Sequence, residues 1–238
     1  MFVSRKDMER IPEPELMEEK EHVISYDEAD FSEGEVNLIN QINHYLLRNN
    51  ISLSKKDLIV DLGCGPGNIS EKLAIKWPNT EVVGIDGSKE MILRAEYKKN
   101  ISTNHKKLKN LRYICCDIKD IKSINFLLKK RISLLVSNSL IHHITTLEDF
   151  FNTIRSLSCN ITVNFHKDLK RPLDEKSALE LKAQCSTKYN EIVTNDYYAS
   201  LRASYTFKEL KNFTLENYLS SLDVYEDGDK YLIVYGNV

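Results

Sequence analysis

Three glycines at alternate positions are the residues of this sequence that point most clearly to a chemical role. Gly63, Gly65 and Gly67 fall in the string D-L-G-C-G-P-G-N of residues 61–68. Glycine lets the backbone take a positive φ and lets a ligand approach without a Cβ in the way. The free N–H groups at the start of a following helix favour an anionic group. The spacing therefore predicts a turn that holds a ligand.

The segments on either side of these glycines predict the element that positions them. Residues 58–62 form a short apolar run without alternation, which is typical of a strand buried on both faces of a parallel sheet. Residues 69–77 place their apolar side chains at helical spacing. Strand, glycine turn and helix together open a nucleotide-binding βαβ unit. A dinucleotide fingerprint reads G-x-G-x-x-G, and here the third glycine comes one residue early.

The string D-L-G-C-G-P-G after an apolar strand resembles the glycine motif of class I S-adenosylmethionine-dependent methyltransferases. The segment that carries the paired histidines His142 and His143 resembles the corresponding segment of small-molecule methyltransferases of the quinone-biosynthesis type. The resemblance implies a Rossmann-like three-layer α/β sandwich, whose seven-stranded, mostly parallel sheet ends in an antiparallel hairpin. It also implies S-adenosyl-L-methionine as the cofactor. The expected activity is methyl transfer to an oxygen, nitrogen or carbon nucleophile of a small molecule.

Two acids at predicted strand ends are expected to hold the cofactor. Asp86 closes a strand over residues 81–86, and a carboxylate there can accept both ribose hydroxyls. In the resembling family the acid after the third strand, here Asp117, receives the adenine amino group. The residues expected to bind the cofactor are Asp61, Gly63, Cys64, Gly65, Gly67, Asn68, Asp86, Gly87, Met91, Asp117, Ile118 and Asn138.

A histidine pair follows the fourth predicted strand, residues 132–138. Ligands of open parallel sheets bind beyond the carboxyl ends of the strands, near the point where strand order reverses. Because imidazole titrates near neutrality, His142 or His143 could take a proton from the substrate. The alternative left open is that one histidine caps a helix and the other packs. No metal is expected, since the five cysteines form no C-x-x-C pair and residues 137–139 contain no acidic cluster.

The expected organisation is an N-terminal helical segment covering the cleft (1–50) and a methyltransferase domain (51–238). The fifth strand is predicted at residues 160–165, and a helical insertion at about 166–205 follows it. The resemblance implies that the insertion roofs the substrate and that an aromatic such as Tyr26 covers the sulfonium. A solvated connector and simple packing remain alternatives. The polar groups that could orient an acceptor are Tyr26, His166, Lys167, Arg171, Tyr197 and Arg202.

Composition excludes several classes of protein. The chain has 238 residues and a net charge of −2, so a global basic field for nucleic acid is absent from the sequence. No apolar run reaches the length of a membrane span, and the N-terminus lacks the apolar core of a signal peptide. We therefore expect a cytoplasmic protein with reduced cysteines, as a monomer or homodimer.

Three other functions share parts of this pattern. A nicotinamide oxidoreductase also has a strand, glycines and a late acid, but the glycine spacing argues against it. A protein or RNA methyltransferase needs a cleft wide and basic enough for a polymer. A non-catalytic protein that keeps the fold is disfavoured by the intact turn and both acids.

Overall fold

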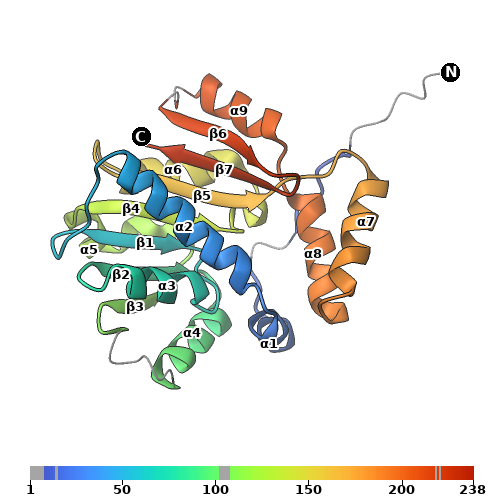
Figure 1. Ribbon diagram of the computed structural model, residues 1–238, viewed down its shortest axis with the longest axis horizontal. Helices are drawn as coiled ribbons and strands as arrows, with labels where there is room; N and C mark the ends of the chain where they lie inside the picture. The colour runs from blue at the N-terminus through green and yellow to red at the C-terminus, as the bar shows by residue number, and fades with distance from the viewer. Residues whose placement is uncertain (1–7, 14–15, 102–107, 218, 220) are drawn as a thin grey trace.

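A seven-stranded sheet carries the fold of the residues that the computed structural model describes, which are 8–13, 16–101, 108–217, 219 and 221–238 (Figure 1). The strand order is β3-β2-β1-β4-β5-β7-β6. The strands are β1 (Leu58–Leu62), β2 (Glu81–Asp86), β3 (Leu111–Cys115), β4 (Ile132–Asn138), β5 (Val163–Leu169), β6 (Leu222–Asp227) and β7 (Tyr231–Gly236).

The direction of the strands confirms the predicted fold class. Neighbours from β3 to β5 pair in parallel, whereas β7 pairs antiparallel with both β5 and β6. Strand β1 has β2 on one side and β4 on the other, so the strand order reverses between β1 and β4. In an open sheet of this kind the ligand site is expected beyond the carboxyl ends of these two strands.

Helices cover both faces of the sheet. On one face α2, α3 and α4 contribute to a buried apolar cluster, and on the other face α6, α9 and the short turn η2 do so. The bounds of these elements are α2 (Ser32–Arg48), α3 (Asn68–Lys76), α4 (Lys89–Ile101), η2 (Ile118–Ser123), α5 (Asn125–Lys129), α6 (Leu147–Leu157) and α9 (Phe207–Glu216).

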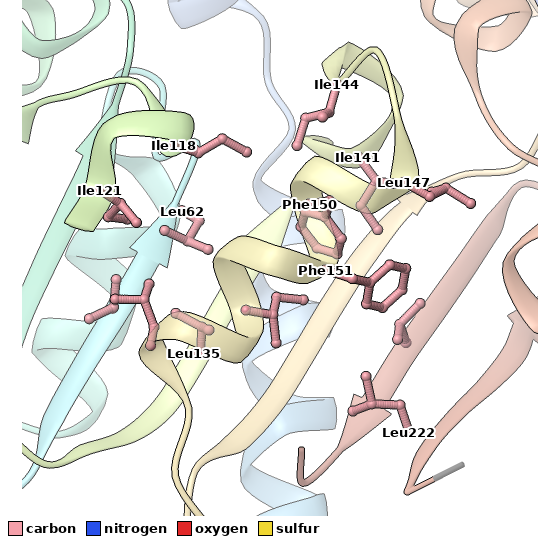
Figure 2. Close-up of a cluster of buried hydrophobic side chains, with 14 of the residues drawn as sticks. Leu62, Ile118, Ile121, Leu135, Ile141, Ile144, Leu147, Phe150, Phe151 and Leu222 are labelled. Carbon is pink, nitrogen blue, oxygen red and sulfur yellow. The ribbon is translucent and has the colours of Figure 1, made fainter. Parts of the chain in front are cut away.

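Strand β1 shows how the sequence produces the three layers. Its side chains alternate, so Leu62 lies in the cluster with Phe150 and Phe151 of α6, as Figure 2 shows. Ile59 points to the opposite face and joins the cluster that contains Leu38 of α2. Because both faces are covered, every position of β1 must be buried, which is why its apolar run does not alternate.

Helices α1 (Lys20–Glu28), α7 (Glu175–Ser186) and α8 (Glu191–Ala203) lie beyond the carboxyl ends of the strands (Figure 1). Helices α7 and α8 fall within residues 166–205, the range for which a helical insertion was predicted. Strand β5 runs to Leu169, so His166 and Lys167 are strand residues with buried side chains. Their polarity suggested a loop, yet β5 is flanked by β4 and β7, and each side chain finds a partner inside.

The five cysteines are all free thiols, as expected. Among the described residues, no helix combines the length and the apolar character needed to cross a bilayer.

Candidate functional site

A cavity of about 1070 Å³ lies at the carboxyl ends of β1, β2 and β4. Its wall includes residues of α1 and α2 on one side and of α7 and α8 on the other. The predicted cofactor residues that line it are Asp61, Gly63, Cys64, Gly65, Asn68, Asp86, Gly87, Met91, Asp117, Ile118 and Asn138. Gly67 is outside the lining.

Gly65 and Gly67 are required for different reasons, although both have a positive φ, of +52° and +86°. A Cβ on Gly65 would meet no atom closer than the Met91 sulfur at 4.0 Å, so this backbone is open toward the cavity. A Cβ on Gly67 would clash with the phenol of Tyr113. Gly65 therefore keeps a backbone surface accessible to a ligand, and Gly67 allows helix α3 to pack closely on the sheet.

Asp86 fixes the loops on both sides of the turn. Its carboxylate accepts hydrogen bonds from the backbone N–H groups of Gly65 and Ser88, each at 2.8 Å. Burial raises the pKa of this carboxyl above its ordinary value. A carboxylate has about four acceptor positions, so both oxygens retain capacity for ribose hydroxyls.

A second buried acid, Asp61, stands at the base of the turn. The Ser70 hydroxyl donates to its carboxylate at 2.6 Å. Burial raises the pKa of Asp61 to about 7. Burial also raises the pKa of the neighbouring Cys64 thiol, which makes that cysteine a poor nucleophile.

Asp117 reaches the same cavity from the adjacent strand end. It caps η2 by accepting from the Lys119 N–H at 2.8 Å, and Asp86 pairs in register with Cys115 of β3. The two acids therefore lie at neighbouring strand ends, as the sequence predicted. Together with the open backbone of Gly65, this arrangement fits a nucleoside held at its sugar and its base.

Leu16 and Met17 of the N-terminal segment line the cavity next to the loop that follows β2. The Ser88 hydroxyl donates to the Met17 carbonyl at 2.6 Å, and Leu16 lies so close to Gly87 that a Cβ there would come within 2.6 Å of it. Leu16 therefore packs directly on the Gly87 backbone, and a side chain at position 87 would have to displace it.

Aromatic side chains join the N-terminal helices to the insertion across the cavity. The Tyr26 and Phe31 rings lie 5.1 Å apart, and so do the rings of Phe31 and Tyr189. The Tyr189 hydroxyl also donates to the Asp30 carbonyl at 2.9 Å. Tyr26 and Tyr197 both line the cavity, at the place where the sequence suggested acceptor contacts.

The histidine pair forms the turn η3 (Ile141–His143) and lines the cavity. Nδ1 of His142 lies 2.5 Å from Oδ1 of Asp168, whose other oxygen accepts from the Ile141 N–H. Burial alone would lower the pKa of His142, but the Asp168 carboxylate outweighs it and raises that pKa. Glu13 approaches the same two rings from the N-terminal segment.

Three residues proposed for the acceptor, His166, Arg171 and Arg202, lie outside the cavity lining. The Arg171 guanidinium donates to the Ser204 carbonyl at 3.0 Å and to Glu209 Oε1 at 2.6 Å. His166 is fully buried, 2.9 Å from the Ser137 hydroxyl through Nδ1, and burial lowers its pKa to about 3. The guanidinium of Arg202 packs over the Tyr198 ring at 5.6 Å. Each of the three side chains instead contacts other parts of the fold, so the structure does not place them at the acceptor site.

Lys167 is the residue of β5 that does line the cavity. Its ammonium lies 2.6 Å from Asp227 Oδ2 and 4.5 Å from the centre of the Tyr231 ring. Glu13, Asp168 and Asp227 are site residues that the sequence did not reveal, because no local motif connects any of them to the glycine turn.

Comparison with known proteins agrees with this geometry. A family model described as a methyltransferase domain matches residues 53–199. A trans-aconitate 2-methyltransferase of Streptomyces avermitilis is 49% identical over 37 residues, which are 16% of this chain and 14% of that protein. The match thus spans well under two thirds of the length of that relative.

Solved structures share the fold over nearly the whole chain. The plantazolicin methyltransferase BpumL, in complex with a pentazolic desmethylPZN analogue and SAH, aligns with a TM-score of 0.67 at 18% identity, covering 92% of this chain and 91% of that one. A SAM-dependent methyltransferase from Aquifex aeolicus aligns with a TM-score of 0.63 at 16% identity, covering 92% and 98%.

Proposed function

This chain belongs to the methyltransferase domain family, and we propose that it transfers the methyl group of S-adenosylmethionine to a small-molecule acceptor. The observation that carries the proposal is the meeting of three features in one cavity: the open backbone at Gly65, the Asp86 carboxylate and the Asp117 carboxylate. When bound, S-adenosylmethionine supplies an electrophilic methyl group on a sulfonium.

The chain's own residues then have defined tasks. Asp86 accepts hydrogen bonds from the ribose, while Asp117 and the Ile118 N–H meet the adenine. Tyr26 and Phe31 exclude water above the reacting centre, which lengthens the lifetime of a near-attack geometry. The protein mainly needs to align the acceptor with the methyl group.

The acceptor lies, in this proposal, between the insertion and the end of β4. Tyr26, Tyr197, Lys167 and the pair His142–His143 line that part of the cavity. The phenols and the ion pair of Lys167 with Asp227 favour an acceptor with polar groups. The contacts of the N-terminal segment and of Tyr189 across the cavity support a small molecule over a protein or RNA chain.

We propose that residues 1–50 act as the cover of a domain formed by residues 51–238. The cytoplasmic location expected from the sequence stays a prediction.

Calorimetric titration with S-adenosylhomocysteine (SAH) tests the cofactor assignment. We expect micromolar binding to the wild-type protein and a loss of at least about 10-fold for Asp86→Ala, because each ribose hydrogen bond to a charged group contributes about 1.5–3 kcal/mol. Asp229→Asn, in the exposed turn between β6 and β7, is the control. Absence of binding at millimolar SAH would reject the assignment. Release of SAH in the presence of candidate acceptors separates an enzyme from a binding protein.

A further inference from the structure

We propose that Glu13, His142 and His143 form a binding site for a divalent transition-metal ion of the zinc class. Oε1 of Glu13 lies 3.4 Å from Nε2 of His142 and 3.4 Å from Nδ1 of His143. The donor atoms of all three residues lie within 4.8 Å of one another. The N-terminal segment and the turn η3, which are far apart in the sequence, thus place one carboxylate and two imidazoles next to one another.

The two separations between Glu13 Oε1 and the imidazole nitrogens match a metal site better than they match hydrogen bonds. Zinc binds nitrogen and oxygen at about 2.0–2.2 Å in tetrahedral geometry, which places neighbouring donor atoms about 3.3–3.6 Å apart. A hydrogen bond between nitrogen and oxygen is shorter, about 2.7–3.2 Å. Both separations from Glu13 Oε1 fall in the first range.

The Glu13 carboxylate has few other hydrogen-bond donors among the described residues. Its side chain is only 10% exposed, and Oε1 has no hydrogen-bond partner in the part of the chain that the structure describes. The other oxygen, Oε2, meets the Ser200 hydroxyl at 3.4 Å. A buried carboxylate oxygen without a donor is costly, and a cation held between the two rings would satisfy it.

Asp168 orients one of the two imidazoles for this purpose. Oδ1 of Asp168 lies 2.5 Å from Nδ1 of His142. The second oxygen of Asp168, Oδ2, accepts a hydrogen bond from the Ile141 N–H at 2.5 Å. With the proton on Nδ1, the lone pair of Nε2 faces Glu13. A carboxylate behind a histidine is the usual second partner of a metal-binding imidazole.

The N-terminal segment holds Glu13 in place through Arg10. The Arg10 guanidinium donates to the carbonyls of Ala203, His142 and Ile144, at 2.6, 3.2 and 3.0 Å. The Ile11 N–H donates to the Arg202 carbonyl at 3.0 Å. The carboxylate is therefore delivered by an anchored piece of backbone, which favours a specific site.

The donor set indicates the type of ion. Imidazole suits zinc, iron, copper and nickel, whereas magnesium and calcium prefer oxygen ligands alone. Three protein donors leave one position of a tetrahedral ion for water or a ligand oxygen. Because both histidines line the cavity, an ion here would hold an oxygen of the acceptor. That last use rests on the proposed methyl transfer, whereas the binding of the ion does not.

Metal titration of the full chain tests the site. After treatment with a chelator, Zn²⁺ is titrated by calorimetry and Co²⁺ by visible absorption, with Mg²⁺ as a further probe. We expect one Zn²⁺ or Co²⁺ per chain, a tetrahedral cobalt spectrum without the charge-transfer band of a thiolate, and no comparable binding of Mg²⁺. Glu13→Gln and His143→Gln should each lower the Zn²⁺ affinity about 100-fold, and Asp168→Asn about 10- to 100-fold.

The controls make the test decisive. His44→Gln removes an exposed histidine of α2 and should leave the affinity unchanged. Far-ultraviolet circular dichroism and SAH titration with chelator present verify that each variant is folded. Absence of stoichiometric Zn²⁺ binding, a thiolate band, or wild-type affinity in both Glu13→Gln and His143→Gln would overturn the proposal. Because SAH binding is measured without metal and metal binding without SAH, failure of this site and failure of the proposed function are distinguishable.

Discussion

Gly65 and Gly228 offer a matched pair of residues for testing the ligand role of the turn. Both have a positive φ, of +52° and +66°, and neither would bring a Cβ closer than 4.0 Å to a neighbour. Alanine at either site should cost about 1–2 kcal/mol of backbone strain. Gly228 also lines the cavity, but it follows Asp227, the partner of Lys167 on the proposed acceptor side, so only Gly65→Ala would place a methyl group against the expected cofactor.

We therefore expect Gly65→Ala to weaken SAH binding about 10-fold or more, and Gly228→Ala to leave it within about 2-fold. Urea unfolding should show similar losses of stability for both variants. Equal SAH affinity in the two variants would contradict the role of Gly65.

Asp57 gives a prediction for the dependence of stability on pH. Burial would raise the pKa of this carboxyl, but hydrogen bonds from Ser133, Ser54 and Arg131 outweigh it and hold the pKa at about 2. The folded protein thus binds this proton less readily than the unfolded chain does. The resulting stability is present above about pH 4 and is lost as the pH falls toward 2.

The measurement is urea unfolding of Asp57→Asn at pH 7 and pH 3. We expect a loss of about 1–2 kcal/mol in the free energy of unfolding at pH 7 and a smaller difference from wild type at pH 3. Asp229→Asn, an exposed turn residue, should differ little from wild type at either pH. A loss that is the same at both values of pH would show that the charge is not responsible.

Among individual residues, the sequence predicted the position of those that belong to a local motif. The glycines, Asp86 and Asp117 follow strands, and the carboxyl ends of parallel strands meet at one edge of the sheet. Glu13 and Asp168 were missed because their importance comes from contacts across the fold. His166 was misassigned, since a polar residue in a covered strand is indistinguishable in sequence from one in a loop.

Elements that follow simple periodicity were predicted well. Strand β4 has the predicted bounds, residues 132–138, and α9 begins with a capping box of Thr206 and Glu209. In helix α2, Phe31 occupies the N-cap position, and the Asp30 carboxylate accepts from the Ser32 N–H. Helix α1 was not predicted, since a short charged segment has a weak apolar pattern.

The attachment of the N-terminal segment is tested at Arg10. We expect Arg10→Ala to increase hydrogen exchange at the Ile11 amide, because the guanidinium links this segment to the carbonyls of η3 and α8. Exchange in β1 should stay unchanged. Arg48→Ala, at the exposed end of α2, is the control and should have no effect on Ile11. Unchanged exchange at Ile11 in Arg10→Ala would show that other contacts suffice.

In the molecule as a whole, a covered sheet provides the floor of the cavity and the segments before β1 and after β5 provide its cover. The floor could be predicted because it is built from regular elements. The cover could not, because the contacts of Tyr26, Phe31 and Tyr189 depend on how distant helices meet.

Two tyrosines allow a test of whether contacts across the cavity slow the release of a ligand. The Tyr189 hydroxyl bonds the Asp30 carbonyl, whereas the Tyr198 hydroxyl bonds Glu175 within the insertion. Tyr189→Phe should speed SAH dissociation several-fold in stopped-flow measurements, while Tyr198→Phe should not. Each variant should lose only about 0.5–1.5 kcal/mol of stability, since a typical hydrogen bond contributes that much. Equal dissociation rates would mean that the bridge does not retain the ligand.

The contact between Arg10 and the Ala203 carbonyl joins residues 193 positions apart. During synthesis on the ribosome, the segment that carries Arg10 and Glu13 emerges early, but the surfaces that receive it are made only after most of the chain has been translated. A nascent chain would therefore leave the ribosome with its sheet partly assembled and its first residues still undocked. This part of the cavity wall can form only after Ala203 has been translated.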